Sequence, residues 1–123
     1  HISYAHFGGK QFFGLPGFPN STLVTFELFA KEILWRLNGG YFVPITLEIL
    51  LQENVSKTDS RLEFRVCNVR NVGGKWKIDF EGKKDFQSAI LNNFCPLDSA
   101  YNGLCVLDSA KSVGEMVRVI LLI

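Results

Sequence analysis

Residues 41–81 read YFVPITLEILLQENVSKTDSRLEFRVCNVRNVGGKWKIDFE, and three parts of this stretch alternate between apolar and polar side chains. The alternating parts are residues 41–52, 61–70 and 75–81. Side chains on a strand point to opposite faces in turn, so the pattern predicts three successive antiparallel strands with one apolar and one charged face. A sheet of this kind is covered on one face only, so we expect the rest of the chain to supply the cover.

The alternation also predicts which side chains are buried. Between the second and third strands, residues 71–74 read NVGG and supply the positive-φ positions of a tight hairpin. The alternation of side chains along the second strand predicts that Cys67 points away from the core. The side chains expected in the core of this sheet are Phe64, Trp76, Ile78 and Phe80.

The expected cover is a helix over residues 26–37. Phe29, Ile33 and Leu37 fall on one helical face, and the following Asn-Gly-Gly is typical of a helix end. Residues 22–28 also alternate like a strand, which leaves open a short strand before the helix.

The C-terminal part predicts shorter elements. Residues 84–94 suit a short helix, and Asp108 and Ser109 suit the N-cap of another helix over residues 110–116. Residues 118–123 are apolar and β-branched, which predicts a last strand that pairs back into the sheet.

These elements predict a single α+β domain over residues 1–123. Residues 1–19 are rich in Gly, Phe and Pro, which deny the backbone a regular ladder, so we expect an ordered arm packed on the core. The predicted hairpin and the following GKWKI, residues 74–78, are similar to a hairpin of cystatin-like and NTF2-like folds. Because the inhibitory loop of cystatins is missing, that resemblance concerns the fold only.

Composition excludes some partners. An apolar fraction of 47% with 11 Phe predicts a packed core, and a formal charge of +1 without a run of Lys or Arg argues against nucleic acid. No apolar run approaches the roughly 18 residues of a membrane span.

Three features favour a secreted protein. The chain starts at His1, as in a processed protein or a fragment, and Asn20 and Asn54 each begin a glycosylation triplet. Residues 95–100 and 105–110 form a repeat, CPLDSA and CVLDSA. A disulfide between Cys95 and Cys105 explains this repeat better than a metal site that includes Asp98 and Asp108, because no Cys-x-x-Cys is present.

Recognisable catalytic motifs are absent, and no cofactor is indicated. Residues 19–28 together with Cys95 and residues 103–108 resemble the C-terminal portion of histidine acid phosphatases, which implies a phosphatase or a fragment of one. The Arg-His-Gly and His-Asp motifs of that family are missing, so no catalytic residue carries over. A second alternative is a copper site at His1 and His6, because an N-terminal His chelates through its amine and its ring.

The function that the sequence favours is a small secreted, non-enzymatic module that binds another macromolecule, most simply a protein. Loops present such contacts, and the expected binding loops are residues 53–60, 72–74 and 101–103. The candidate binding residues are Lys57, Asp59, Val72, Tyr101 and Asn102.

Overall fold

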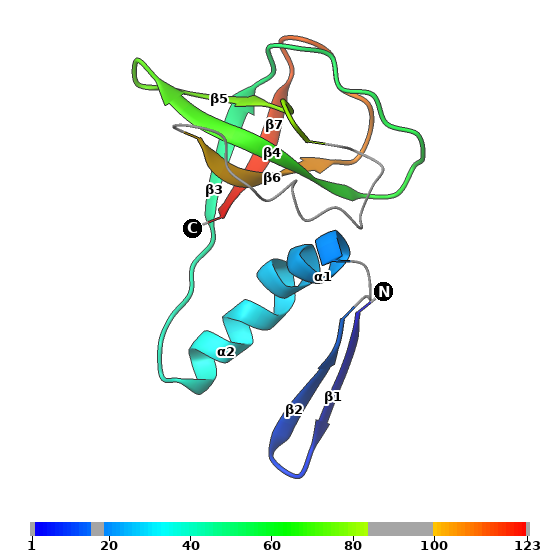
Figure 1. Cartoon of the computed structure of the whole chain (residues 1–123), viewed down its shortest axis with the longest axis vertical. Helices are drawn as coiled ribbons and strands as arrows, with labels where there is room; N and C mark the ends of the chain where they lie inside the picture. Colours follow the sequence, from blue (N-terminus) through cyan, green and yellow to red (C-terminus); the bar gives the residue numbers. More distant parts are fainter. Residues whose placement is uncertain (1, 16–18, 84–99, 123) are drawn as a thin grey trace. The chain divides into compact units, whose positions relative to one another are not determined.

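The computed structural model describes residues 2–15, 19–83 and 100–122, which belong to two compact units (Figure 1). The first unit holds the described residues up to 43, and the second holds those from 44 onward. That the whole chain is one domain stays a prediction.

The first unit begins with a hairpin of β1 (Ser3–Phe7) and β2 (Lys10–Gly14), which pair antiparallel. Gly8 and Gly9 form its turn with φ of 57° and 75°, a conformation that glycine adopts without steric cost. The expectation that this segment has no regular ladder is therefore wrong, because its glycines lie in the turn and its first proline, Pro16, follows the paired residues.

A continuous helix follows, made of α1 (Pro19–Thr25), η1 (Phe26–Ala30) and α2 (Lys31–Leu37). The helix predicted over residues 26–37 is confirmed, whereas the alternative of a strand over residues 22–28 is wrong. Thr25 Oγ1 donates to the carbonyl oxygen of Ser21 at 2.8 Å, a bond that often bends helices, and the π-helical turn η1 begins at the next residue. The helix ends as expected at Asn38, and Gly39 has φ of 76°.

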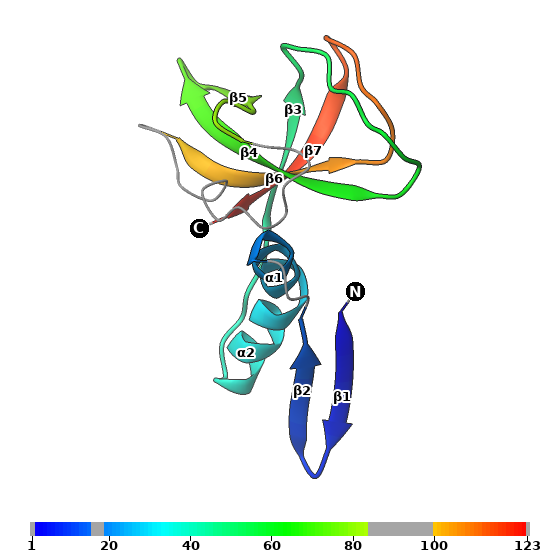
Figure 2. The same cartoon turned by 45° about the vertical axis from the view of Figure 1, so that its right-hand side comes forward.

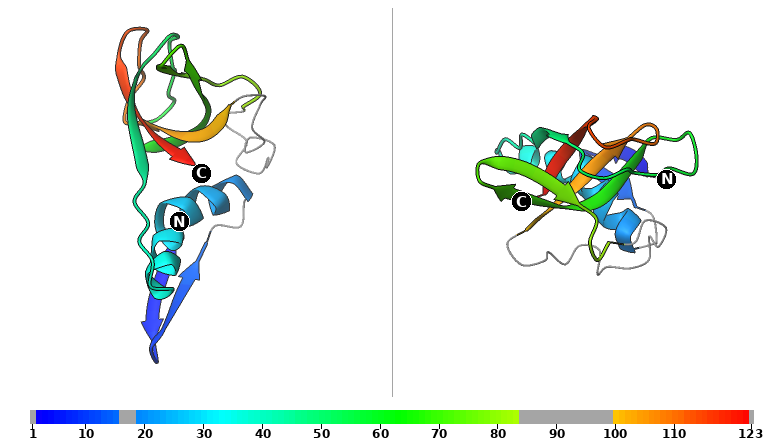
Figure 3. Two further views of the ribbon diagram at one scale, coloured as in Figure 1. Left: turned by 90° about the vertical axis from the view of Figure 1, so that its left-hand side faces the viewer. Right: turned by 90° about the horizontal axis from the view of Figure 1, so that it is seen from above.

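In its described residues, the second unit is one antiparallel sheet of five strands in the order β3-β7-β6-β4-β5. Figures 2 and 3 show that the sheet curls into a half-barrel. A mostly antiparallel sheet with one helix confirms the α+β class. The strands are β3 (Ile45–Leu50), β4 (Glu63–Val72), β5 (Lys75–Asp79), β6 (Tyr101–Leu107) and β7 (Met116–Leu122).

The structure confirms the β4–β5 hairpin, whose turn residues Gly73 and Gly74 have φ of 60° and 85°, and it confirms the last strand, β7. The predicted order of strands is wrong, because β3 pairs with β7 and not with β4. The strand β6 was not predicted at all.

The helix predicted over residues 110–116 is wrong. Lys111 forms an isolated bridge with Val55, and Gly114 has φ of 90°, so this segment is extended and then turns into β7. The short helix predicted over residues 84–94 lies outside the described residues.

The core lies on the inner face of the curl, where Cys67 packs fully buried. The prediction that Cys67 points outward is therefore wrong, and Phe64, which alternates with it along β4, lies on the opposite face and is only half-buried. The predicted burial of Ile78 is confirmed, with Trp76 and Phe80 partly buried beside it. The buried core residues are Ile49, Leu51, Val55, Cys67, Val69, Ile78, Cys105, Leu107, Val117, Val119 and Leu121.

All of these described core residues belong to the second unit, so the strands bury one another's side chains through the curl of the sheet. The packing of the helix on one face of the sheet stays a prediction. Within the described ranges, none of the helical segments has the length and the apolar character needed to cross a membrane.

Candidate functional site

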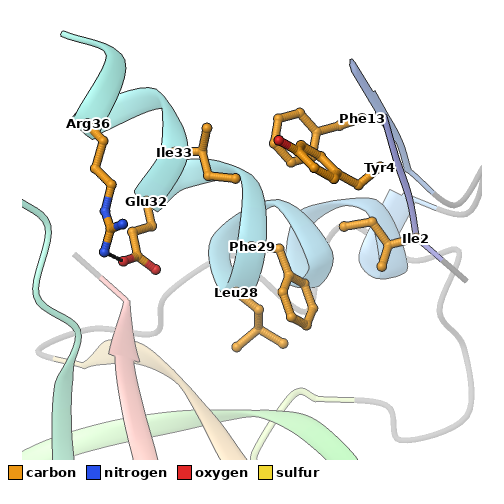
Figure 4. A pocket seen from close by; sticks show the side chains of 8 residues that line it. All are labelled: Ile2, Tyr4, Phe13, Leu28, Phe29, Glu32, Ile33 and Arg36. Atoms are coloured by element: carbon orange, nitrogen blue, oxygen red, sulfur yellow. Dashed lines mark hydrogen bonds and ion pairs between the residues drawn. The ribbon is translucent and has the colours of Figure 1, made fainter. Parts of the chain in front are cut away.

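A pocket in the first unit is the candidate site, and the hairpin forms one of its walls (Figure 4). The wall is made by Ile2, Tyr4 and Phe13. Tyr4 and Phe13 are cross-strand partners whose ring centroids lie 5.2 Å apart at 50°, a favourable tilted arrangement. The Tyr4 hydroxyl donates to Gln11 Oε1 at 3.0 Å, which fixes the orientation of the ring.

The helix forms the other wall through Leu28, Phe29 and Ile33, and Glu32 and Arg36 complete the lining. Arg36 Nη2 donates to Glu32 Oε1 across one helical turn, and Figure 4 shows this ion pair on the helix side of the pocket. The pocket has a volume of about 400 Å³.

The lining of the pocket is mostly apolar. Among its eight described lining residues, six are apolar or aromatic, and the two charged ones, Glu32 and Arg36, form an ion pair with each other. The lining therefore favours an apolar occupant.

The candidate binding residues from the sequence do not meet at one place. Lys57 and Asp59 lie in the loop before β4, whereas Val72 ends β4 and Tyr101 and Asn102 begin β6 beside it. Tyr101 and Asn102 pair with Val69 and Asn68, five to six residues beyond the start of β4, which puts them roughly 17–20 Å from that end at the usual rise per residue, and Val72 lies further still. None of the five residues lines the pocket.

The Lys57–Asp59 loop is held by internal bonds. The Lys57 side chain is 1% exposed, and its amine donates to the backbone oxygen of Asp59 at 2.7 Å and to Asp59 Oδ1 at 2.9 Å. Arg61 Nη2 donates to the other carboxylate oxygen at 2.9 Å. Hydrogen bonds from Lys57 and Arg61 hold the pKa of Asp59 well below its usual range. The charges of Lys57 and Asp59 therefore pair with each other and stabilise the loop.

Asn102 belongs to a polar cluster on the outer face of the sheet. Lys83 Nζ donates to Asn102 Oδ1 at 3.1 Å, and the register places Asn102 beside Asn68 of β4. Asn68 is fully buried, and its amide donates to Asp79 Oδ1 at 2.7 Å and to the carbonyl oxygen of Glu81 at 2.9 Å. These bonds tie the end of β5 to β4.

The remaining predicted site residues are those of the disulfide, the metal site and the glycosylation triplets. Cys105 is a free buried thiol, so the predicted Cys95–Cys105 disulfide is wrong; Cys95 and His1 lie outside the described residues. His6 is exposed on β1, and the described ranges contain no group of three His, Cys, Asp or Glu side chains placed to hold a metal. Asn20 lies in α1, and Asn54 Oδ1 accepts the backbone N–H of Val113 at 2.9 Å.

The two described thiols are expected to stay unreactive in the folded protein. Burial raises the pKa of Cys105 to about 12 and also raises that of Cys67, so almost no thiolate forms at pH 8. Cys67 pairs with Gly103, so Cys105 is its diagonal neighbour at roughly 7–8 Å, too far for a disulfide.

We expect a thiol reagent at pH 8 to titrate two thiols of the Cys95→Ser variant only after denaturant is added. Rapid reaction of either thiol in the native protein would contradict this burial.

The sequence held one usable signal for the pocket. The pair Gly8-Gly9 between Phe7 and Lys10 is typical of a two-residue hairpin turn, and such a turn places Tyr4 opposite Phe13. Phe29 and Ile33 were already expected on one helical face. The hairpin was overlooked because the high Gly and Pro content of residues 1–19 was interpreted as an irregular arm.

The two units combine a hairpin–helix with a curled antiparallel sheet, which places the chain in the α+β class. No protein-family model matches the chain, and no curated protein does.

Several solved structures do resemble the chain. A molybdenum cofactor biosynthesis protein from Pyrococcus furiosus matches with a TM-score of 0.61 and 23% identity, over 89% of this chain and 38% of that one. A molybdopterin biosynthesis moeA protein from Pyrococcus horikoshii OT3 matches with a TM-score of 0.59 and 20% identity, over 86% and 26%. A second structure of a moeA protein from this species matches with a TM-score of 0.57 and 25% identity, over 96% and 28%. The chain thus spans about a quarter to two fifths of the length of these structures.

These likenesses contradict the function predicted from the sequence. The matching structures are described as proteins of cofactor biosynthesis, which overturns the secreted binding module and both of its alternatives, the phosphatase and the copper protein. The predicted secretion and glycosylation, which rested on the start at His1, the triplets at Asn20 and Asn54 and the expected disulfide, are also contradicted. The sequence interpretation failed because it relied on the absence of known motifs, which excludes some chemistry but identifies none.

Proposed function

We propose that this chain is part of a protein of molybdenum cofactor biosynthesis. The observation that carries the proposal is the match of 96% of the chain to the structure of a molybdopterin biosynthesis protein at 25% identity. Two further structures with related descriptions cover both the hairpin–helix and the sheet, since they match 86% and 89% of the chain.

Within this proposal the fold is that of two units of a biosynthetic protein and not a cystatin-like or NTF2-like domain. The pocket supports a binding or structural contribution from the first unit, because its lining is apolar apart from one neutralised ion pair. A protein partner remains a prediction.

A genetic experiment tests the proposal in the source organism. Disrupting the gene that encodes this chain should abolish molybdenum cofactor in the cells, and with it the activity of molybdenum-dependent enzymes. The intact gene should restore both. A gene with Val72→Asp, a change at an exposed position, should restore them as well, whereas Val69→Asp in the buried core should not. Unchanged cofactor content in the disrupted strain would contradict the proposed function.

A further inference from the structure

The helix of the first unit ends in an exposed Asn-Gly step. Asn38 is the C-cap residue of α2 with φ of −90° and ψ of 12°, and Gly39 follows with φ of 76°. Both residues are exposed, and together they form the turn that leaves the helix. Because Gly39 has no side chain, nothing on this residue shields its backbone nitrogen from the side chain of Asn38.

Two hydrogen bonds hold this step in the folded turn. Asn38 Nδ2 donates to the carbonyl oxygen of Leu34 at 2.9 Å, and the N–H of Gly39 donates to the carbonyl oxygen of Arg36 at 3.0 Å. The last turn of a helix frays at a small fraction of the free energy of global unfolding. Fraying therefore releases both the side-chain amide of Asn38 and the nitrogen of the next residue.

The chain contains a second Asn-Gly step in a contrasting setting. Asn102-Gly103 lies in β6, which pairs with β4 on one side and with β7 on the other. Gly103 is buried, and Asn102 Oδ1 accepts a hydrogen bond from Lys83 Nζ at 3.1 Å. The release of this step requires the strand pairing on both sides of β6 to open.

We propose that Asn38 is a site of spontaneous deamidation and that the sheet protects Asn102 from the same reaction. In the frayed turn the nitrogen of Gly39 forms a bond to Asn38 Cγ and the bond from Cγ to Nδ2 breaks. The amide proton of Gly39 leaves with the side-chain nitrogen as ammonia. Water then opens the cyclic imide and leaves aspartate or isoaspartate at position 38, so the reaction needs no enzyme and no cofactor.

The product weakens the end of the helix. A carboxylate cannot donate to the carbonyl oxygen of Leu34, so the bond from Asn38 Nδ2 is lost. Its negative charge also lies at the negative end of the helix dipole. The isoaspartate form in addition lengthens the backbone by one carbon atom where the chain leaves the helix. The modified chain therefore has a looser last helical turn.

Peptide mass mapping of the complete gene product tests the modification. During incubation for weeks at neutral pH, the amide of Asn38 should be converted to a carboxylate at least about tenfold faster than that of Asn102. In denaturant, where neither step is held by hydrogen bonds, the two rates should become similar. Equal rates in the folded protein, or faster conversion at Asn102, would overturn the proposal.

A pair of variants tests the effect on the helix. The N–H groups of residues 38–40 donate to carbonyl oxygens of the last helical turn. In Asn38→Asp, which supplies one of the products, these groups should exchange with deuterium several-fold faster than in the wild type. Asn38→Gln keeps an uncharged amide and should cause a smaller change. Exchange in Asn38→Asp that equals the wild-type exchange would overturn the proposed weakening.

Discussion

Replacing Gly103 with alanine is expected to destabilise the second unit by about 1–3 kcal/mol. A Cβ at this position would lie 2.5 Å from Val69 Cγ2 and 2.9 Å from Val119 Cγ1, both in the fully buried core. Neither side chain can move away without disturbing the two neighbouring strands. Urea denaturation followed by circular dichroism should show a lower midpoint with an unchanged slope.

A second substitution tests whether this contact is the cause. Val69→Ala alone removes buried apolar atoms and destabilises the protein, but it also removes the Cγ2 atom nearest to the new Cβ. The double variant should therefore lose less free energy of unfolding than the sum of the two single variants. Purely additive losses would show that the close approach of β6 to β4 at Gly103 is not what disfavours a side chain there.

The largest loss is expected for Val69→Asp. Val69 is fully buried among apolar neighbours, so the new side chain must either lose its hydration as a carboxylate or take up a proton. That cost of several kcal/mol is a large part of the stability of a small domain. We expect the second unit to lose its cooperative unfolding transition in circular dichroism.

Val72→Asp is the matched control, because it makes the same chemical change on the same strand where the side chain is 52% exposed. We expect its free energy of unfolding to lie within about 0.5 kcal/mol of the wild-type value. Similar losses in the two variants would contradict the assignment of Val69 to the inner face of β4.

The sequence predicted the wrong face of β4 to lie in the core, and this error has a physical origin. Residues 65–69 are all buried, so the strand is covered on both faces and the alternation along its sequence does not identify the inner face. Arg65 and Glu63 share the inner face and form an ion pair, and the Arg65 guanidinium lies 5.9 Å from the centre of the Phe80 ring. Charged residues were expected on the outer face, which shifted the predicted core from Cys67 to Phe64.

Local patterns predicted the helix, the β4–β5 hairpin and β7, because each depends on neighbouring residues in the sequence. They did not predict β6, since Asn102-Gly103 inside it is typical of a turn. In the structure Gly103 allows close packing between strands, because Val69 and Val119 leave no room for a Cβ at this position.

Local sequence patterns could not predict the pocket, for a similar reason. Its two walls come from a hairpin and a helix that meet only in the folded unit. The loop residues chosen in its place, such as Lys57, carry charges that turn out to satisfy one another.

The pairing of β3 with β7 affects the order in which the second unit can assemble. Glu48 and Arg118 form an ion pair across these strands although 70 positions separate them in the sequence. The β4–β5 hairpin can close soon after synthesis, because its strands are neighbours in the chain. By contrast, β3 must wait, with its edges and its apolar face open to water, until β7, its partner in the described sheet, has been synthesised. We therefore expect slow closure of this sheet during translation and a dependence on chaperones in that interval.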